Sequence, residues 1–102
     1  MKYREIQASE AESILGADGA LVLDLRDNIS YREGHIEGAM LAHDALTESI
    51  IKRKEYDRPI MVYCYHGNSS KEFAEFISAL GFRNVYNLAG GFTAWKKQLA
   101  SE

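Results

Sequence analysis

The sequence predicts one α/β domain, residues 1–102, with a small, mainly parallel five-stranded sheet and helices on both faces. Short and nearly continuous apolar runs recur along the chain, as is typical of strands that are covered on both faces. Segments with helical periodicity separate these runs, and strands that alternate with helices favour parallel pairing through right-handed crossovers. The 102 residues, of which 46% are hydrophobic, suffice for one modest core.

The first part of the chain is expected to form a strand, a helix and a second strand. Tyr3–Ile6 is a short candidate strand. Ser9 and Glu12 have the spacing of a capping box, which predicts a helix that starts at Ser9. The apolar run Ala20–Leu25 then indicates a buried strand.

The middle of the chain repeats this alternation. Ala39–Ala42 is a weaker candidate strand, and Asp44–Lys54 is a predicted helix. Asp44 is expected to cap that helix, and the basic residues in its last turn suit the helix dipole. Pro59 opens the next strand, Ile60–Cys64.

The last part contributes two helices and one strand. Residues 69–81 are expected to form a helix that Gly81 ends, and residues 92–99 form the closing helix. Asn84–Leu88 is the strand between them. The apolar side chains expected on one stripe of the first helix are Phe73, Phe76, Ile77 and Leu80. Of these, Phe73, Phe76 and Ile77 are expected in the core, as is Trp95.

Composition excludes several classes of function. The net charge is -3 and basic residues are mixed with acidic ones, so no basic stripe predicts a nucleic-acid partner. No apolar run approaches the roughly 20 residues of a membrane span and no signal peptide is recognisable, so a cytoplasmic location is expected. The single cysteine cannot form an internal disulfide, and the three histidines show no zinc-ligand spacing. No metal or cofactor is expected.

Cys64 ends a predicted strand, at the edge of the sheet where α/β folds bind their ligands. The next helix starts about six residues later, so the loop must turn tightly, and Gly67 and Asn68 tolerate left-handed backbone angles. Consecutive N–H groups and the N-terminus of the helix near Ser69 or Ser70 can then surround the sulfur. We call residues 65–70 the cradle.

The cradle can activate the sulfur without a histidine base. A thiol with a pKa of about 8.5 is only about 3% thiolate at pH 7, and lowering the pKa by two units takes about 2.7 kcal/mol. A helix terminus supplies about 0.3 to 2 kcal/mol, and each charge-assisted hydrogen bond about 1.5 to 3 kcal/mol. Two other interpretations stay open at this point: a lone cysteine is commonly a small buried hydrophobe, and such cradles also bind phosphate.

Four segments resemble those of rhodanese-like sulfurtransferases, specifically the single-domain thiosulfate sulfurtransferases of the GlpE type. The segment "CYHGNSSK", residues 64–71, is similar to their active-site loop. Residues 22–27, "VLDLRD", resemble their D-x-R strand end, and residues 31–42, "YREGHIEGAMLA", their G-H-I-x-G-A signature. Residues 81–95, "GFRNVYNLAGGFTAW", resemble the C-terminal signature that ends in A-W.

The resemblance implies a reaction and a site. Cys64 would take the outer sulfur of thiosulfate as a persulfide, release sulfite, and pass the sulfur to cyanide or to a thiol such as thioredoxin. Many rhodaneses carry an arginine directly after the cysteine, where this chain has Tyr65, so Lys71 and Arg26 are the obvious cations for a dianionic substrate. The residues whose N–H groups would hold the persulfide and the sulfonate are Tyr65, His66, Gly67, Asn68, Ser69 and Ser70.

Two alternative functions remain. The first is a phosphatase or arsenate reductase of the related fold, whose longer cysteine loop ends in an arginine, whereas Ser69 and Ser70 stand at either possible loop end in this chain. The second is a non-catalytic binding module, which the intact Cys64 disfavours.

Structural roles are expected for several further residues. Asp24 and Arg26 are interpreted as a buried or half-buried pair that organises the strand ends. His35 is expected to be a hydrogen-bonded structural residue, and Gly90 and Gly91 a close-packed turn before a helix.

Overall fold

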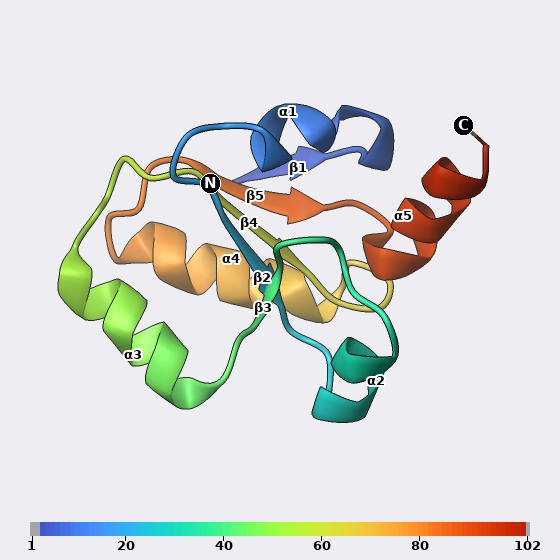
Figure 1. Cartoon of the computed structure of the whole chain (residues 1–102). Coiled ribbons are helices and arrows are strands. Elements are labelled where there is room, and N and C mark those ends of the chain that lie inside the picture. The colour runs from blue at the N-terminus through green and yellow to red at the C-terminus, as the bar shows by residue number, and fades with distance from the viewer. Residues whose placement is uncertain (1–2, 102) are drawn as a thin grey trace.

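The computed structural model describes residues 3–101. Its sheet has the strand order β1-β5-β4-β2-β3, and every neighbouring pair is parallel, as predicted (Figure 1). The strands are β1 (Arg4–Ile6), β2 (Leu21–Asp24), β3 (Met40–Leu41), β4 (Ile60–Tyr63) and β5 (Val85–Leu88). The helices are the 3-10 helix η1 (Ala8–Glu10), α1 (Glu12–Leu15), α2 (Asn28–Glu33), α3 (Asp44–Arg53), α4 (Ser69–Ala79) and α5 (Gly91–Ala100).

Side chains of β2, β4 and β5 alternate between two hydrophobic clusters, one on each face of the sheet. Leu21 and Leu23 of β2 pack with Ile77 of α4 and Ile50 of α3. Val22, from the same strand, packs on the opposite face. The cluster there contains Ile6 of β1, Ala11 just before α1, Ile14 of α1 and Trp95 of α5. The prediction of helices on both faces is therefore confirmed.

Two predicted helix caps are wrong. The first helical segment begins with η1, where Gln7 and Glu10 make the capping box, and α1 proper spans only Glu12–Leu15. The cap of α3 is His43, whose Nδ1 accepts the N–H of Leu46 at 3.2 Å, while Asp44 lies in the first turn. Both differences move a predicted start by one or two residues without moving the element.

The apolar stripe predicted for α4 is only partly correct. Ile77 is buried, but Phe76 is 50% exposed and Leu80 is 41% exposed. The side chains that α4 buries are otherwise small, namely Ser70, Ala74 and Ser78. These small residues let the helix lie close to the sheet, and they turn the larger residues Phe76 and Leu80 toward solvent. The prediction that Phe76 belongs to the core is therefore wrong.

Helix α2 was not predicted from the sequence. Its N-cap is Asp27, whose carboxylate accepts the N–H of Ser30 at 2.8 Å. The helix has six residues, none of which is buried, so it lacks the apolar periodicity by which a helix is recognised. It stands apart from the sheet and beside the loop that leads to β3 (Figure 1).

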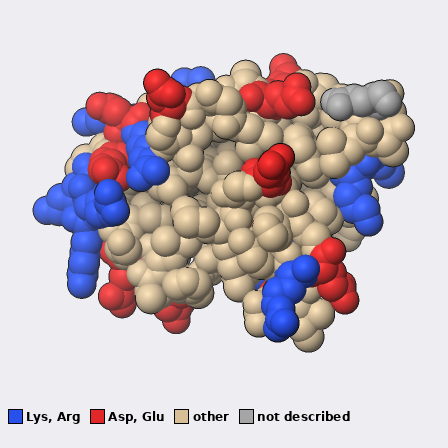
Figure 2. All heavy atoms as spheres, in the orientation of Figure 1, with Lys and Arg blue, Asp and Glu red and all other residues tan. Residues whose placement is uncertain are grey.

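The surface carries charges of both signs. On the face shown in Figure 2, most Lys, Arg, Asp and Glu side chains lie toward the edges, around a broad area that is uncharged except for an acidic side chain near the middle. Arg58 and Arg53 both lie within ion-pair distance of Glu55, beyond the end of α3. Among residues 3–101, no helix has both the length and the apolar character needed to cross a membrane.

Candidate functional site

Cys64 follows β4 at the carboxyl edge of the sheet, between β5 and β2. The strand ends at Tyr63, one residue earlier than predicted, and α4 begins at Ser69. Cys64 is 4% exposed, so most of its surface is covered by the cradle and its neighbours. The sequence therefore placed the thiol correctly at the turn from a central strand into a helix.

Gly67 gives the cradle its tight turn. Its φ of 91° is in the left-handed region, and a Cβ on this residue would lie 2.9 Å from the nitrogen of Gly90 and 3.1 Å from the oxygen of Leu88. Asn68 has an ordinary right-handed backbone with φ of −90°, so the expectation that Asn68 contributes to the turn is wrong. A single glycine performs the reversal.

Two backbone N–H groups of the cradle point at the sulfur. Gly67 donates to Sγ over 3.2 Å and Ser70 over 3.4 Å. The hydroxyl of Ser70 lies 3.3 Å from Sγ. In the described residues the N–H groups of Tyr65, Asn68 and Ser69 make no hydrogen bond to Sγ. The sulfur itself thus engages only part of the predicted ring of donors, and a role for the remaining N–H groups in holding the persulfide or the sulfonate stays a prediction.

These contacts lower the pKa of Cys64. Burial alone raises the pKa, but hydrogen bonds from the hydroxyl and N–H of Ser70 and from the N–H of Gly67, with a smaller contribution from the N–H of His66, outweigh it. Hydrogen bonds to a thiolate are strong because the acceptor is ionised. The site can therefore hold a sulfur anion.

We expect the rate at which iodoacetamide alkylates the native protein to reach half its maximum at a lower pH than for the chain in denaturant. The unfolded thiol should show the ordinary pKa of about 8.5. Because the folded pKa is depressed, the thiolate contributes stability above the unfolded pKa, and this contribution is lost as the pH falls through the folded pKa. Equal midpoints for the native and denatured protein would contradict this account.

The first turn of α5 fixes the backbone of the cradle. Phe92 N–H donates to the carbonyl of Cys64 at 2.8 Å, and Thr93 N–H donates to that of Tyr65 at 3.2 Å. A Cβ on Gly91, whose φ is 59°, would lie 2.5 Å from the oxygen of Cys64. The predicted close-packed turn at Gly90 and Gly91 is confirmed, and it packs closely against the backbone of Cys64 and the cradle.

Gly91→Ala should destabilise the protein by about 2 to 4 kcal/mol, because it adds backbone strain and a steric clash with the cradle. A matched control is Gly38→Ala: Gly38 also has a positive φ, of 85°, but a Cβ there would have no neighbour within 4 Å. This control should cost about 1 kcal/mol from strain alone. Urea unfolding of both variants measures the difference, and equal losses would show that the contact with the cradle is unimportant.

Asp24, Arg26 and Tyr63 form a buried polar cluster next to the cradle. Arg26 Nη2 lies 2.8 Å from Asp24 Oδ2, and its Nε lies 3.1 Å from Oδ1. The Tyr63 hydroxyl donates to the same carboxylate at 2.6 Å. Burial raises the pKa of Tyr63, as does its hydrogen bond to Asp24, so this hydroxyl remains a donor. The predicted Asp24–Arg26 pair is confirmed and is almost fully buried.

Arg26 also borders a cleft of about 380 Å³ beside the cradle, together with Tyr65, Phe92 and Lys96. Its guanidinium carbon lies 4.0 Å from the centre of the Phe92 ring, and its Nη2 also donates to the carbonyl of Gly34 at 2.6 Å. Most of its hydrogen-bonding capacity is therefore directed at the protein. A direct contact between Arg26 and a substrate stays a prediction.

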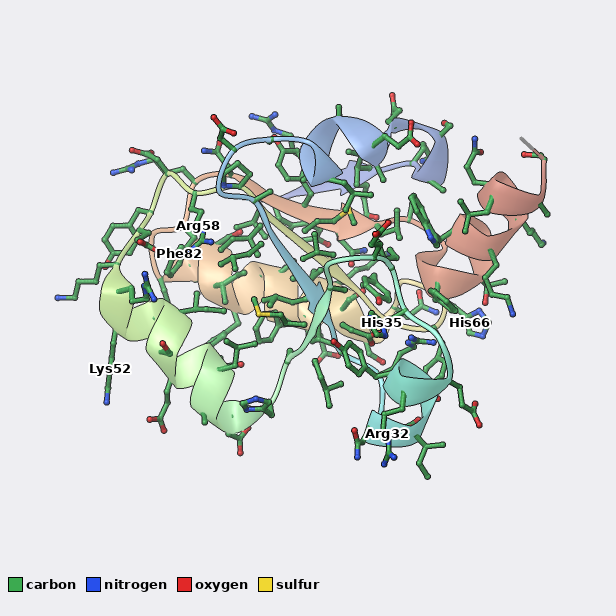
Figure 3. The ribbon with its side chains drawn as sticks, in the orientation of Figure 1. Arg32, His35, Lys52, Arg58, His66 and Phe82 are labelled. Atoms are coloured by element: carbon green, nitrogen blue, oxygen red, sulfur yellow. The ribbon has the colours of Figure 1, made fainter. Side chains whose placement is uncertain are left out.

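The side chains of the other predicted site residues, Tyr65, His66 and Lys71, lie around the cradle and away from the sulfur. Tyr65 directs its hydroxyl away from the sulfur, to Asp27 and Ser30 of the α2 cap, and its hydrogen bond lowers the pKa of Asp27 to about 2. His66 is exposed beside α5 (Figure 3), with Nδ1 3.4 Å from the Thr93 hydroxyl. Lys71 is exposed on the first turn of α4. None of these side chains contacts Sγ among the described residues.

His35 is a structural residue, as expected. Its ring stacks on Tyr31 with centroids 3.9 Å apart, and its Nδ1 donates to the Tyr31 carbonyl at 2.7 Å. In residues 3–101, no group of three or more His, Cys, Asp or Glu side chains could hold a metal ion.

Sequence reasoning missed three contributors to the site. Lys96 adds a cation to the cleft, Asp27 anchors Tyr65, and Asn87 accepts a hydrogen bond from the Ser70 hydroxyl at 2.5 Å. Asp27 could have been found as a helix cap from its spacing to Ser30. Lys96 and Asn87 carry no local signal, because only the tertiary fold brings them to the cradle.

Known proteins are similar to this chain over nearly its whole length. A family model described as Rhodanese-like domain matches residues 7–98. The thiosulfate sulfurtransferase GlpE of Pseudoalteromonas translucida (strain TAC 125) is 36% identical over 96 residues, which cover 94% of this chain and 91% of that protein. The protein of the same name from Pseudomonas entomophila (strain L48) is 38% identical over 101 residues, covering 99% and 92%.

Similarity in three dimensions agrees with these matches. The crystal structure of a rhodanese-related protein from Thermoplasma volcanium aligns with a TM-score of 0.75 at 29% sequence identity. The alignment covers 94% of this chain and 93% of that one. The five-stranded parallel sheet and the helices around it are therefore shared with a solved structure.

Proposed function

The chain belongs to the family of rhodanese-like domains, and from that premise we propose that it is a thiosulfate sulfurtransferase in which Cys64 carries the transferred sulfur. The observation that supports this most directly is the buried Cys64 sulfur, to which Gly67 and Ser70 direct fixed N–H donors. Both the attacking thiolate and the persulfide product are sulfur anions. Preorganised donors stabilise such charge without rearranging during the reaction.

The first half-reaction is a displacement at sulfur. The Cys64 thiolate attacks the outer sulfur of thiosulfate, a bond from Sγ to that sulfur forms, and the bond to the sulfonate sulfur breaks. Its electron pair leaves with sulfite, so the products are a cysteine persulfide anion and sulfite. No proton needs to move, which fits a cradle made of hydrogen-bond donors without a base that contacts Sγ.

The second half-reaction passes the outer sulfur to an acceptor. Cyanide or a thiolate attacks that sulfur, and the electron pair of the broken bond returns to Sγ. Splitting the transfer in two makes each step easier, and the covalent intermediate should give ping-pong kinetics. We propose that thioredoxin is one such thiol acceptor and that the reaction takes place in the cytoplasm, whose reducing conditions keep Cys64 available as a thiol.

Phosphate ester hydrolysis is the weaker alternative. Enzymes that hold a tetrahedral oxyanion in such a loop clamp it with a guanidinium, and residues 64–71 contain no arginine. Arg26 is not free to take the place of this guanidinium clamp, since its Nη2 already donates to Asp24 and to the Gly34 carbonyl. Hydrolysis of a chromogenic phosphate ester that disappears in Cys64→Ser would favour this alternative instead.

Mass spectrometry tests the proposal directly. After incubation with thiosulfate, the intact protein should gain one sulfur atom, and peptide mapping should place it on Cys64. Added cyanide should remove the sulfur as thiocyanate, and reduced thioredoxin should remove it as sulfide. Absence of the adduct with thiosulfate would contradict the proposed donor, and an adduct that no acceptor discharges would contradict the second step.

A further inference from the structure

A chain of hydrogen bonds, buried from the sulfur as far as Asn87, connects the sulfur to the exposed Glu5 of β1, at the edge of the sheet. The Ser70 hydroxyl lies between Cys64 Sγ, at 3.3 Å, and Asn87 Oδ1 of β5, at 2.5 Å. Asn87 Nδ2 in turn donates to the Gly67 carbonyl at 3.1 Å and to the Glu5 carboxylate of β1 at 3.1 and 3.2 Å. Ser70 and Asn87 are both 0% exposed, so no bulk water replaces the contact between them.

The orientation of the Asn87 amide is fixed by its partners. The Gly67 carbonyl and the Glu5 carboxylate only accept hydrogen bonds, so the NH2 group of Asn87 must face them. Its Oδ1 therefore faces Ser70 and can only accept. The Ser70 hydroxyl has one hydrogen, which it can give to Asn87 or to the sulfur, but not to both.

We propose that Asn87 is a positioning residue. It accepts a hydrogen bond from the Ser70 hydroxyl whenever Sγ is uncharged, and it loses this hydrogen bond to the sulfur when Sγ is an anion. In the thiol form, S–H donates to Ser70 and Ser70 donates to Asn87. In the thiolate form, the hydroxyl turns and donates to the sulfur, and Asn87 Oδ1 loses its donor. Asn87 therefore favours the uncharged forms of Sγ over the thiolate.

The same competition acts during sulfur transfer, a step that rests on the proposed function. When the outer sulfur joins Sγ, the negative charge moves to the outer sulfur and Sγ becomes a neutral bridging atom. The Ser70 hydroxyl then returns to Asn87 while the backbone N–H groups remain available to the anion. Asn87 thus stabilises the persulfide relative to the free thiolate and should draw sulfur onto the enzyme.

Substitution of Asn87, made with and without the Ser70 hydroxyl, separates this contact from the charges around it. The titratable and charged side chains of the elements around the cradle are the same in each pair of proteins compared. They are Glu5 on β1, Asp24 and Arg26 after β2, Tyr63 on β4, Tyr65 and His66 in the cradle, Lys71 on α4 and Lys96 on α5. Because Asn87→Leu also removes the hydrogen bonds to Gly67 and Glu5, the Ser70–Asn87 contact is reported by the part of the effect that is lost in the Ser70→Ala background.

The first experiment measures the pKa of Cys64 from the pH dependence of iodoacetamide alkylation. Asn87→Leu, of similar size but without an acceptor, should lower the pKa and raise the thiolate fraction below the pKa by about threefold or more. In the Ser70→Ala background, the same substitution should leave the pKa unchanged, because the connecting hydroxyl is absent. An unchanged pKa in the single variant, or an equal shift in both backgrounds, would overturn the proposal. The assay needs no sulfur donor, so its outcome is independent of the proposed reaction.

The second experiment uses the protein without substitution at Asn87, and it decides the question even if Asn87→Leu does not fold. The side-chain carbonyl ¹³C resonance of Asn87 should shift with the same midpoint as the Cβ resonance of Cys64 when the pH is raised. Ser70→Ala should abolish the Asn87 shift while Cys64 still titrates. An Asn87 resonance that does not shift when Cys64 ionises would contradict the proposal that the Ser70 hydroxyl changes its acceptor.

Discussion

Cys64→Ser should abolish sulfur transfer from thiosulfate to cyanide, with a loss of about 10³-fold or more in kcat/KM. A serine hydroxyl is not ionised at neutral pH and cannot store the transferred sulfur, so neither half-reaction can proceed. The substitution exchanges one atom at a 4% exposed position, and the fold should persist. Thiocyanate production measures the activity, and thermal melting verifies that the variant is folded. Activity near that of the unsubstituted chain would exclude the proposed mechanism.

A relocated cysteine provides the matched control. Ser49 lies exposed on α3, so Ser49→Cys in the Cys64→Ser background restores one thiol to the chain outside the cradle. This double variant should remain inactive and should alkylate with an ordinary thiol pKa of about 8.5. If it recovered thiocyanate production, any accessible thiol would suffice and the cradle would have no catalytic role.

Asp24→Ala should cost about 3 to 5 kcal/mol of unfolding free energy, the largest stability loss we expect from a single substitution. The carboxylate is 0% exposed and binds Arg26 and the Tyr63 hydroxyl. Its removal leaves a buried guanidinium without its counter-charge and a buried hydroxyl without an acceptor. For a chain of this size, each kcal/mol lowers the melting temperature by about 4–8 °C, so a melting curve measures the effect readily.

Asp57→Ala is the control for that prediction. Asp57 also pairs with an arginine, Arg83, at 2.6 Å, but the two side chains are 82% and 63% exposed. Solvent screens this pair, and its loss should cost no more than about 1 kcal/mol. If both aspartates proved equally dispensable, the buried cluster would not stabilise the fold as we describe.

The sequence predicted the sheet because buried parallel strands appear as apolar runs, and the three strongest runs became the adjacent strands β2, β4 and β5. The burial of α4 was less predictable, since the aromatic residues dominate its apolar pattern. Phe73 and Ile77 do pack against the core, but Phe76 faces solvent. Which side of a helix approaches a sheet depends on small residues such as Ala74 that permit close contact, and hydropathy gives them little weight.

The site, too, has features that the sequence predicts and features that only the tertiary structure determines. The position of Cys64, the turn at Gly67 and the donors at the start of α4 follow from neighbouring residues, so they could be predicted. The choice of which N–H groups reach Sγ depends on the backbone angles of the cradle. The contact between Ser70 and Asn87 depends on β5 lying next to β4, which joins residues 17 positions apart. No local pattern records such a contact.

The contact between α5 and the cradle makes the surroundings of the Cys64 sulfur depend on residues from both halves of the chain. The carbonyl groups of Cys64 and Tyr65 accept hydrogen bonds from Phe92 and Thr93. Glu5, far from α5 in the sequence, accepts one from Asn87. A chain still emerging from the ribosome lacks the contacts of Phe92 and Thr93 until α5 has been made, so the backbone of the cradle is held less firmly until then. We therefore expect the lowered pKa of Cys64 to depend on the docking of α5, and time-resolved alkylation during refolding should show the two appear together.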